Sequence, residues 1–141
     1  MKNIAIVYWS GTGNTEAMAH GIADGVKAAG GNAALFTASE FSAAALSDYD
    51  RIAFGCPSMG SEQLEDSEFE PMFSVLEDKL SGKEIALFGS YGWGDGQWMR
   101  DWQERCTGAK IIGGEGLIIN EAPDDEGLEQ CKKLGNRLAA E

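Results

Sequence analysis

Short apolar runs alternate along the chain with stretches in which apolar residues recur every three or four positions. Runs of the first kind are typical of buried β-strands, and stretches of the second kind are typical of amphipathic helices. The expected strands lie at residues 4–9, 33–36, 51–56 and 84–89, with a last strand region at 111–112 and 117–119. The expected helices lie at residues 18–29, 69–80, 98–106 and 128–138, with a short helix or turn at 41–46.

This alternation favours an α/β fold in which a parallel sheet is covered by helices on both faces. Right-handed crossovers then predict a doubly wound, three-layer arrangement. No linker, repeat or low-complexity segment interrupts residues 1–141, and a chain of this length suits a single domain. In such a sheet a ligand binds at the carboxyl ends of the strands, so loops 10–15, 57–62 and 90–96 are expected to converge there.

The first of these loops reads Ser10-Gly11-Thr12-Gly13-Asn14-Thr15 and leads from a strand into a helix. A helix N-terminus offers free backbone N–H groups to an anion, and the hydroxyl and amide side chains add further donors. It is not a nucleoside triphosphate loop, because Asn14 stands where lysine is required. It also fails the dinucleotide fingerprint, because Glu16 replaces the third small residue. Two interpretations remain open, namely a site for one phosphate group and an ordinary turn between strand and helix.

The other two loops each contain one large apolar side chain. Met59 lies in Pro57-Ser58-Met59-Gly60-Ser61-Glu62, and Trp93 lies in Ser90-Tyr91-Gly92-Trp93-Gly94-Asp95-Gly96. A thioether and an indole could hold a flat ring between them, although either side chain could instead fold back onto the core. Trp98 and Trp102 stand four positions apart on an expected helix and are interpreted as core residues, whereas Trp9 is left open.

Charge and cysteine content narrow the choice of partners and compartment. The chain has 23 acidic and 11 basic residues and a net charge of −12, which disfavours nucleic acid and anionic membranes and favours partner proteins with basic docking surfaces. No apolar run is long enough to span a membrane, and the N-terminus lacks the layout of a signal peptide. Cys56, Cys106 and Cys131 are widely spaced, which indicates a cytoplasmic protein with buried thiols.

Taken together, the three loops resemble those of flavodoxins. The motifs that carry the resemblance are residues 8–16, 59–62 and 89–96, and the likeness extends over the whole chain. The chain is most similar to the short-chain flavodoxins of anaerobic bacteria such as clostridia, because its fifth strand lacks a long insertion. The resemblance implies a flavodoxin-like sheet of five parallel strands, in the order 2-1-3-4-5, that binds one FMN without a covalent bond.

The resemblance also implies which residues hold FMN. The phosphate would be held by side chains and backbone N–H groups of the first loop, namely Ser10, Gly11, Thr12, Gly13, Asn14 and Thr15. Met59 would lie against the inner face of the isoalloxazine and Trp93 against its outer face, while Glu62 would accept a hydrogen bond from flavin N3–H. Backbone groups of Ser90, Tyr91 and Gly92 would meet the pyrimidine edge, and Ser58 and Asn120 would lie near the ribityl chain and the ring edge.

The function that the resemblance implies is that of a low-potential one-electron carrier, which shuttles electrons between redox enzymes through the semiquinone and hydroquinone states of FMN. The turn at Met59-Gly60-Ser61 would flip so that the Gly60 carbonyl accepts from flavin N5–H, a change that glycine tolerates well. With no cation in these loops, nearby carboxylate and phosphate charges would disfavour the anionic hydroquinone. Serine at position 61 suits a positive φ less well than glycine, so Ser61→Gly is expected to stabilise the semiquinone.

Two other functions on this fold remain open. A small FMN-dependent reductase of quinones or nitro groups would need a substrate pocket above the flavin, where Trp93 is expected to lie. A phospho-acceptor receiver module would need clustered aspartates at strand ends, whereas the first strand ends in Trp9-Ser10. We therefore expect a monomeric electron-transfer protein and not an enzyme.

Overall fold

Strands and helices alternate along residues 2–140, which the computed structural model of the chain describes. The strands are β1 (Asn3–Tyr8), β2 (Asn32–Thr37), β3 (Arg51–Gly55), β4 (Glu84–Tyr91), β5 (Lys110–Ile111) and β6 (Leu117–Asn120). The α-helices are α1 (Asn14–Ala28), α2 (Phe69–Leu76), α3 (Gln97–Arg105) and α4 (Asp125–Ala139). Three short 3₁₀-helices complete the order: η1 (Ala38–Glu40), η2 (Ala43–Asp48) and η3 (Glu77–Lys79).

The strands form one parallel sheet in the order β2-β1-β3-β4-β5. β6 also pairs with β4, further along it than β5 does, with Leu117 opposite Phe88 and Lys110 opposite Glu84. β5 and β6 therefore share the fifth strand position and are separated by a turn at Gly113-Gly114, where both φ angles are positive. The expected strand order is confirmed, and the interrupted last strand matches the two apolar runs seen in the sequence.

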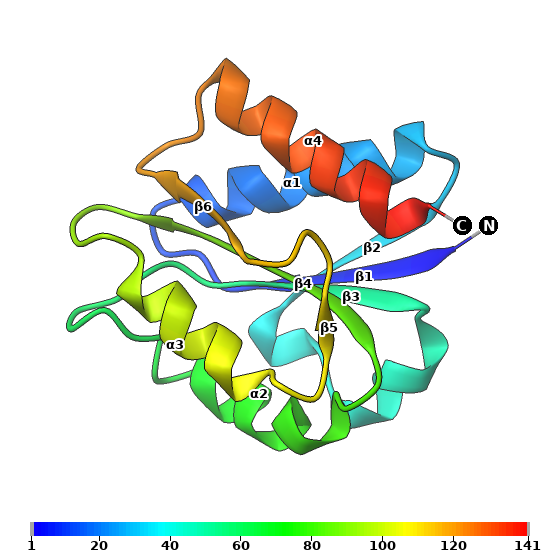
Figure 1. Ribbon diagram of the computed structural model, residues 1–141, viewed down its shortest axis with the longest axis horizontal. Coiled ribbons are helices and arrows are strands. Elements are labelled where there is room, and N and C mark those ends of the chain that lie inside the picture. Colours follow the sequence, from blue (N-terminus) through cyan, green and yellow to red (C-terminus); the bar gives the residue numbers. More distant parts are fainter. Residues whose placement is uncertain (1, 141) are drawn as a thin grey trace.

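Each strand contributes side chains to two cores, because successive residues point to opposite faces of the sheet. Ala5, Val7 and Phe54 pack on the side of α2 and α3, whereas Ile4 and Ile6 pack on the side of α1 and α4. Figure 1 shows these helix pairs below and above the sheet, with both chain ends at the right. Burial of both faces explains why the strands read as continuous apolar runs rather than as alternating patterns.

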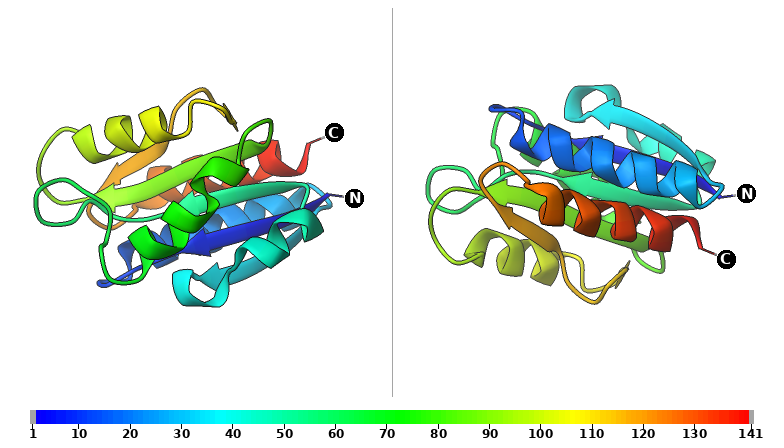
Figure 2. Two further views of the ribbon diagram at one scale, coloured as in Figure 1. Left: turned by 90° about the horizontal axis from the view of Figure 1, so that it is seen from below. Right: turned by 90° about the horizontal axis from the view of Figure 1, so that it is seen from above.

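α1 and α4 lie side by side on one face of the sheet, as the right-hand view of Figure 2 shows. Their backbones approach closely at two glycines. A Cβ added to Gly25 of α1 would lie 2.0 Å from the carbonyl oxygen of Lys132, and one added to Gly135 of α4 would lie 2.1 Å from that of Ile22. Glycine is therefore required at both positions, although it lowers the helix propensity of each segment.

The observed helix limits differ from the expected ones at several ends, since α1 already begins at Asn14 and α4 at Asp125. α2 ends at Leu76, and η3 carries the chain on to Lys79 before the buried Leu80. The short helix or turn expected at 41–46 is the 3₁₀-helix η2, which begins at Ala43. Apolar periodicity identifies the residues that face the core, but it does not determine the hydrogen-bond pattern at the end of a helix.

The expectations for the interior are confirmed. All three cysteines are buried and free, and Trp98 and Trp102 are each only 1% exposed. None of the helices formed by residues 2–140 combines the length and the apolar character that crossing a membrane requires.

Candidate functional site

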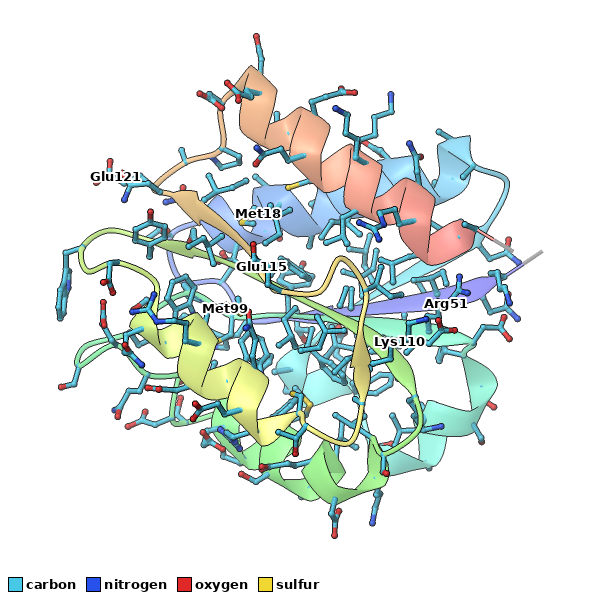
Figure 3. The ribbon with its side chains drawn as sticks, viewed as in Figure 1. Met18, Arg51, Met99, Lys110, Glu115 and Glu121 are labelled. Carbon is cyan, nitrogen blue, oxygen red and sulfur yellow. The ribbon has the colours of Figure 1, made fainter. Side chains whose placement is uncertain are left out.

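A cavity of about 420 Å³ opens at the carboxyl ends of the strands, between the loops that follow β1, β3, β4 and β6. This is the left end of the molecule in Figure 1, and the labelled Glu121 marks it in Figure 3. A volume of this size is typical of pockets for small molecules and cofactors.

Most of the residues that the sequence singles out come together here. Ten of them line the cavity: Ser10, Gly11, Thr12, Asn14, Thr15, Ser58, Met59, Ser90, Tyr91 and Gly92. The other expected residues are not part of the lining: Gly13, Gly60, Ser61, Glu62, Trp93 and Asn120. Four further residues complete the lining, of which the sequence left Trp9 open and gave no role to Pro57, Glu121 and Ala122. Their only signal in the sequence is a position next to a strand end.

The first loop is folded around the hydroxyl group of Ser10. Ser10 Oγ accepts hydrogen bonds from the N–H groups of Gly13 at 3.1 Å and of Glu16 at 3.2 Å. Gly13 precedes α1 with a φ of 95°, a left-handed conformation that favours glycine. Within residues 2–140, the N–H groups of Thr12 and Asn14 donate no hydrogen bond to the backbone or to Ser10 Oγ. These two groups, at the positive end of the α1 dipole, are therefore free to bind an anion.

The hydroxyl groups of Thr15 and Ser90 join the first loop to the end of β4. Their oxygen atoms lie 3.0 Å apart, and the Ser90 N–H also donates to Thr15 Oγ1 at 3.4 Å. Both residues are nearly buried. The sequence predicts Thr15 as a phosphate ligand, and the structure adds a second role for its side chain, which fixes the two loops relative to each other.

The second loop is a tight hairpin with Gly60 and Ser61 at its tip. Met59 and Gln63 exchange two backbone hydrogen bonds of 2.8 and 3.0 Å. The φ angle is 41° at Gly60 and 53° at Glu62, whereas the φ angle of Ser61 is not positive. The strain expected at Ser61 therefore does not arise in this conformation, and the effect of Ser61→Gly stays a prediction about a flipped turn.

One oxygen of the Glu62 carboxylate is buried without a partner. No donor in residues 2–140 forms a hydrogen bond with Oε1. The same atom lies against Gly94 of the third loop, where an added Cβ would meet it at 1.5 Å. Because a buried carboxylate oxygen without a donor costs free energy, this atom favours a ligand that supplies an N–H group.

Met59 and Trp93, the two expected ring contacts, differ in their surroundings. Met59 is half-buried and lines the cavity, whereas the side chain of Trp93 is 65% exposed and lies outside the lining. The interpretation in which Trp93 folds back onto the core is therefore wrong. Its indole ring is available to cover a bound ring, a contact that would remove apolar surface from water.

Trp9, which the sequence left open, lies beside the first loop at the edge of the cavity. Its ring packs over Gly11, where an added Cβ would lie 2.9 Å from the indole. Its Nε1 donates to Glu68 Oε1 at 3.2 Å. Trp9 therefore forms part of the cavity wall and is held there by a residue of the loop that follows β3.

Asn120 connects two loops rather than lining the cavity. Its Nδ2 donates to the carbonyl oxygen of Tyr91 at 3.1 Å, and the N–H of Glu121 donates to the same oxygen at 2.7 Å. The next two residues, Glu121 and Ala122, line the cavity. Asn120 thus orients the loop that follows β6, while its neighbours face the ligand space.

The chemistry of this cavity fits FMN. The free N–H groups at the start of α1 suit a phosphate, and Glu62 Oε1 suits the N3–H of an isoalloxazine ring. Met59 and Trp93 suit the flat faces of that ring. Among residues 2–140, those that line the cavity include no Lys or Arg. The phosphate would therefore be held by neutral donors.

Comparisons with known proteins agree with the fold. The Flavodoxin family model matches residues 6–135. The flavodoxin of Megasphaera elsdenii is 50% identical over 138 residues, which cover 96% of this chain and 98% of that protein. The flavodoxin of Clostridium beijerinckii is 46% identical over 134 residues, which cover 95% and 97%. The solution structure of the two-electron-reduced Megasphaera elsdenii flavodoxin matches with a TM-score of 0.88 at 49% identity, covering 96% and 98% of the two chains.

A doubly wound parallel sheet with a glycine-containing loop before its first helix and a cavity of about 420 Å³ at its carboxyl edge is typical of flavin-binding α/β proteins. The chain belongs to the flavodoxin family. It is an FMN-binding electron carrier, so the resemblance seen in the sequence is confirmed. Flavodoxins are electron-transfer proteins that serve redox partners and are not enzymes, and no finding favours the reductase alternative.

Proposed function

We propose that the phosphate of FMN lies at the N-terminus of α1. The free N–H groups of Thr12 and Asn14 support this placement, and their side chains add neutral donors. Ser10 shapes the loop by accepting from Gly13 and Glu16. Because no lysine is present to polarise the phosphate, this loop anchors the cofactor and does not prepare the phosphate for transfer.

The isoalloxazine ring lies between Met59 and Trp93 in this proposal, and Glu62 accepts from its N3–H. The observation that carries the proposal is the buried, unpartnered Glu62 Oε1 beside Gly94. A flavin N3–H would satisfy that oxygen, and the flat ring that carries this N–H suits the side chains of Met59 and Trp93.

When bound, FMN accepts and releases electrons one at a time. The chain sets the potential at which it does so. The Glu62 carboxylate and the acidic loops oppose the addition of negative charge, which supports a low potential. Gly60 has a positive φ at the exposed hairpin tip, so the peptide after it can reorient at little conformational cost.

Titration of the FMN-free protein with FMN and with riboflavin tests this proposal. FMN should bind one molecule per chain with its fluorescence quenched, and riboflavin should bind more weakly because it lacks the phosphate. Stepwise reduction with dithionite should show two one-electron steps. Equal affinity for riboflavin would contradict the phosphate site. Steady NAD(P)H-dependent turnover of a quinone without any other protein would contradict the carrier function.

We also propose that redox partners dock with basic surfaces on the cavity end of a monomer. The loops that follow β1, β3, β4 and β6, residues 9–13, 56–68, 92–96 and 121–124, contain seven acidic residues and no Lys or Arg. A partner that approaches the flavin therefore meets a negative potential, which favours a basic surface and opposes pairing with a second copy of this chain. Sedimentation equilibrium of the FMN-bound protein tests the monomer.

A cytoplasmic location and a single domain complete the proposal. All three cysteines are free and buried, which is typical of a reducing compartment. The two cores lie on opposite faces of the same sheet, which supports one cooperative unit. Urea unfolding followed by tryptophan fluorescence and by circular dichroism should give coincident transitions.

A further inference from the structure

Glu65 lies between β3 and α2, and the proposed FMN site does not use it. Its side chain is only 5% exposed. Oε1 accepts hydrogen bonds from the N–H groups of Glu68 and Phe69, both at 2.8 Å, and Oε2 accepts from the N–H and the hydroxyl of Ser67. The carboxylate therefore caps the first turn of α2. Burial acts to raise the pKa of Glu65, but these hydrogen bonds together hold it below its usual value, so the group is charged at neutral pH.

The backbone of Glu65 is attached to the end of β3. Its N–H donates to Cys56 Sγ at 3.3 Å, and its carbonyl oxygen accepts from the N–H of Glu70 at 2.8 Å. Cys56 is fully buried, and its own carbonyl oxygen accepts from Trp98 Nε1 at 3.1 Å. Loop 57–64, which includes the Met59–Gln63 hairpin, thus begins and ends at two anchored residues that contact each other.

Glu65 also reaches the phosphate side of the cavity through Glu68. Glu65 Oε1 accepts from the N–H of Glu68, and Glu68 Oε1 accepts from Trp9 Nε1 at 3.2 Å. The ring of Trp9 in turn packs over Gly11 of the first loop. One buried carboxylate is therefore connected to two walls of the same cavity.

We propose that Glu65 is a positioning residue for the cofactor, which holds the base of loop 57–64 so that its conformational freedom is confined to the tip at residues 60–62. The tip is exposed at Gly60 and Ser61 and is closed only by the Met59–Gln63 pair, whereas the base is held by the contacts of Glu65 and Cys56. A loop with a fixed base presents Met59 and Glu62 to the ring in one arrangement, which lowers the conformational entropy lost on binding. This inference rests on the proposed FMN site.

The test compares Glu65→Gln with Asp66→Asn. The two variants remove one negative charge at adjacent positions, but only the first removes an acceptor oxygen from the cap, since the exposed Asp66 accepts none of these hydrogen bonds. In the FMN-free protein, Glu65→Gln should speed amide hydrogen exchange at Met59 and Gln63 about tenfold, and it should raise the dissociation constant of FMN about tenfold. It should also change the separation between the two midpoint potentials. Asp66→Asn should change each quantity less than about twofold.

Several results would overturn this role. Equal changes in both variants would mean that charge alone acts. A lower melting temperature with unchanged exchange and unchanged FMN affinity would mean that Glu65 only stabilises α2. If Glu65→Gln does not fold, Ser67→Ala, which removes one donor to Oε2, must show the same changes to a smaller degree, and their absence would contradict the proposal. Failure of the unmodified chain to bind FMN would instead overturn the proposed site, and the exchange measurement without FMN keeps the two cases apart.

Discussion

At the scale of single residues, Glu62 combines two unfavourable features. Its φ of 53° is uncommon for a residue with a Cβ and costs about 1 kcal/mol, and the buried Oε1 without a donor costs roughly another 1–3 kcal/mol. Such features persist where the surrounding structure enforces them, and they cluster at ligand sites. A flavin N–H bound to Oε1 would offset the second cost.

Glu62→Gln is expected to raise the midpoint potential for the second electron. The substitution keeps an acceptor oxygen but removes a negative charge beside the one that reduction adds. An interaction of order 1 kcal/mol between these charges corresponds to about 40 mV for one electron. Redox titration followed by flavin absorbance measures the change, and Asp48→Asn, at the end of η2, is the matched control. An unchanged or lowered potential would contradict this role of Glu62.

At the scale of elements, the helices are held in place by contacts that the apolar pattern does not reveal. The backbones of α1 and α4 touch at Gly25 and Gly135. α2 and η3 are joined to α3 by Arg105, which contacts Glu70 at 2.7 and 2.8 Å and Glu77 at 2.8 Å. Both features hold the helices against their neighbours, one on each face of the sheet.

Gly25→Ala and Gly135→Ala are each expected to lower the free energy of unfolding by about 1–3 kcal/mol. The added methyl group would overlap a backbone carbonyl of the neighbouring helix, so the helices must move apart despite the better helix propensity of alanine. The midpoint of urea unfolding without FMN measures the loss. Lys133→Ala, on the exposed side of α4, should change it by less than about 0.5 kcal/mol. If the two alanine variants were as stable as the original chain, the backbones of α1 and α4 would not be in close contact at these glycines.

The contribution of Arg105 to stability is expected to depend on pH. Its hydrogen bonds with Glu70 lower the pKa of that carboxyl group. A pKa that is lowered in the folded state adds stability. This stability is fully present above the pKa of the unfolded state, about 4.3, and is lost as the pH falls through the pKa of the folded state. Arg105→Leu should therefore cost about 1–3 kcal/mol at about pH 7 and less below about pH 4. A loss that does not change with pH would mean that packing against Phe73, rather than charge, holds Arg105.

At the scale of the whole molecule, charge is distributed unevenly around the sheet. The loops at the cavity end hold seven acidic residues and no basic ones, whereas Arg51 and Lys110 lie toward the opposite end, as Figure 3 shows. With a net charge of −12 and these acidic loops, the molecule should attract cations to the end where we propose that the flavin lies. The charge therefore affects how fast a partner meets the flavin more than how the chain folds.

Electron transfer from the reduced protein to small acceptors should show this charge. The rate with a tripositive cobalt hexaammine should fall as salt increases, and the rate with the anion ferricyanide should rise, because salt screens attraction in one case and repulsion in the other. Stopped-flow measurement across a range of ionic strength gives both slopes. Slopes of the same sign for the two acceptors would contradict a dominant effect of the acidic loops.

The sequence by itself determined the elements, the strand order implied by its family and the three loops that meet at the cavity. The elements and the loops are local features, because the spacing of apolar residues reports burial and a short motif reports its own turn, whereas the strand order was implied only by the resemblance to a family. Only the tertiary structure decided which loop groups stay free for a ligand. Thr15 bonds to Ser90, 75 residues away, and Trp9 bonds to Glu68, 59 residues away. Trp93 remains exposed, whereas Glu65 is buried and caps α2. The sequence could not predict either outcome, because hydrogen-bond partners and solvent access depend on contacts between distant segments.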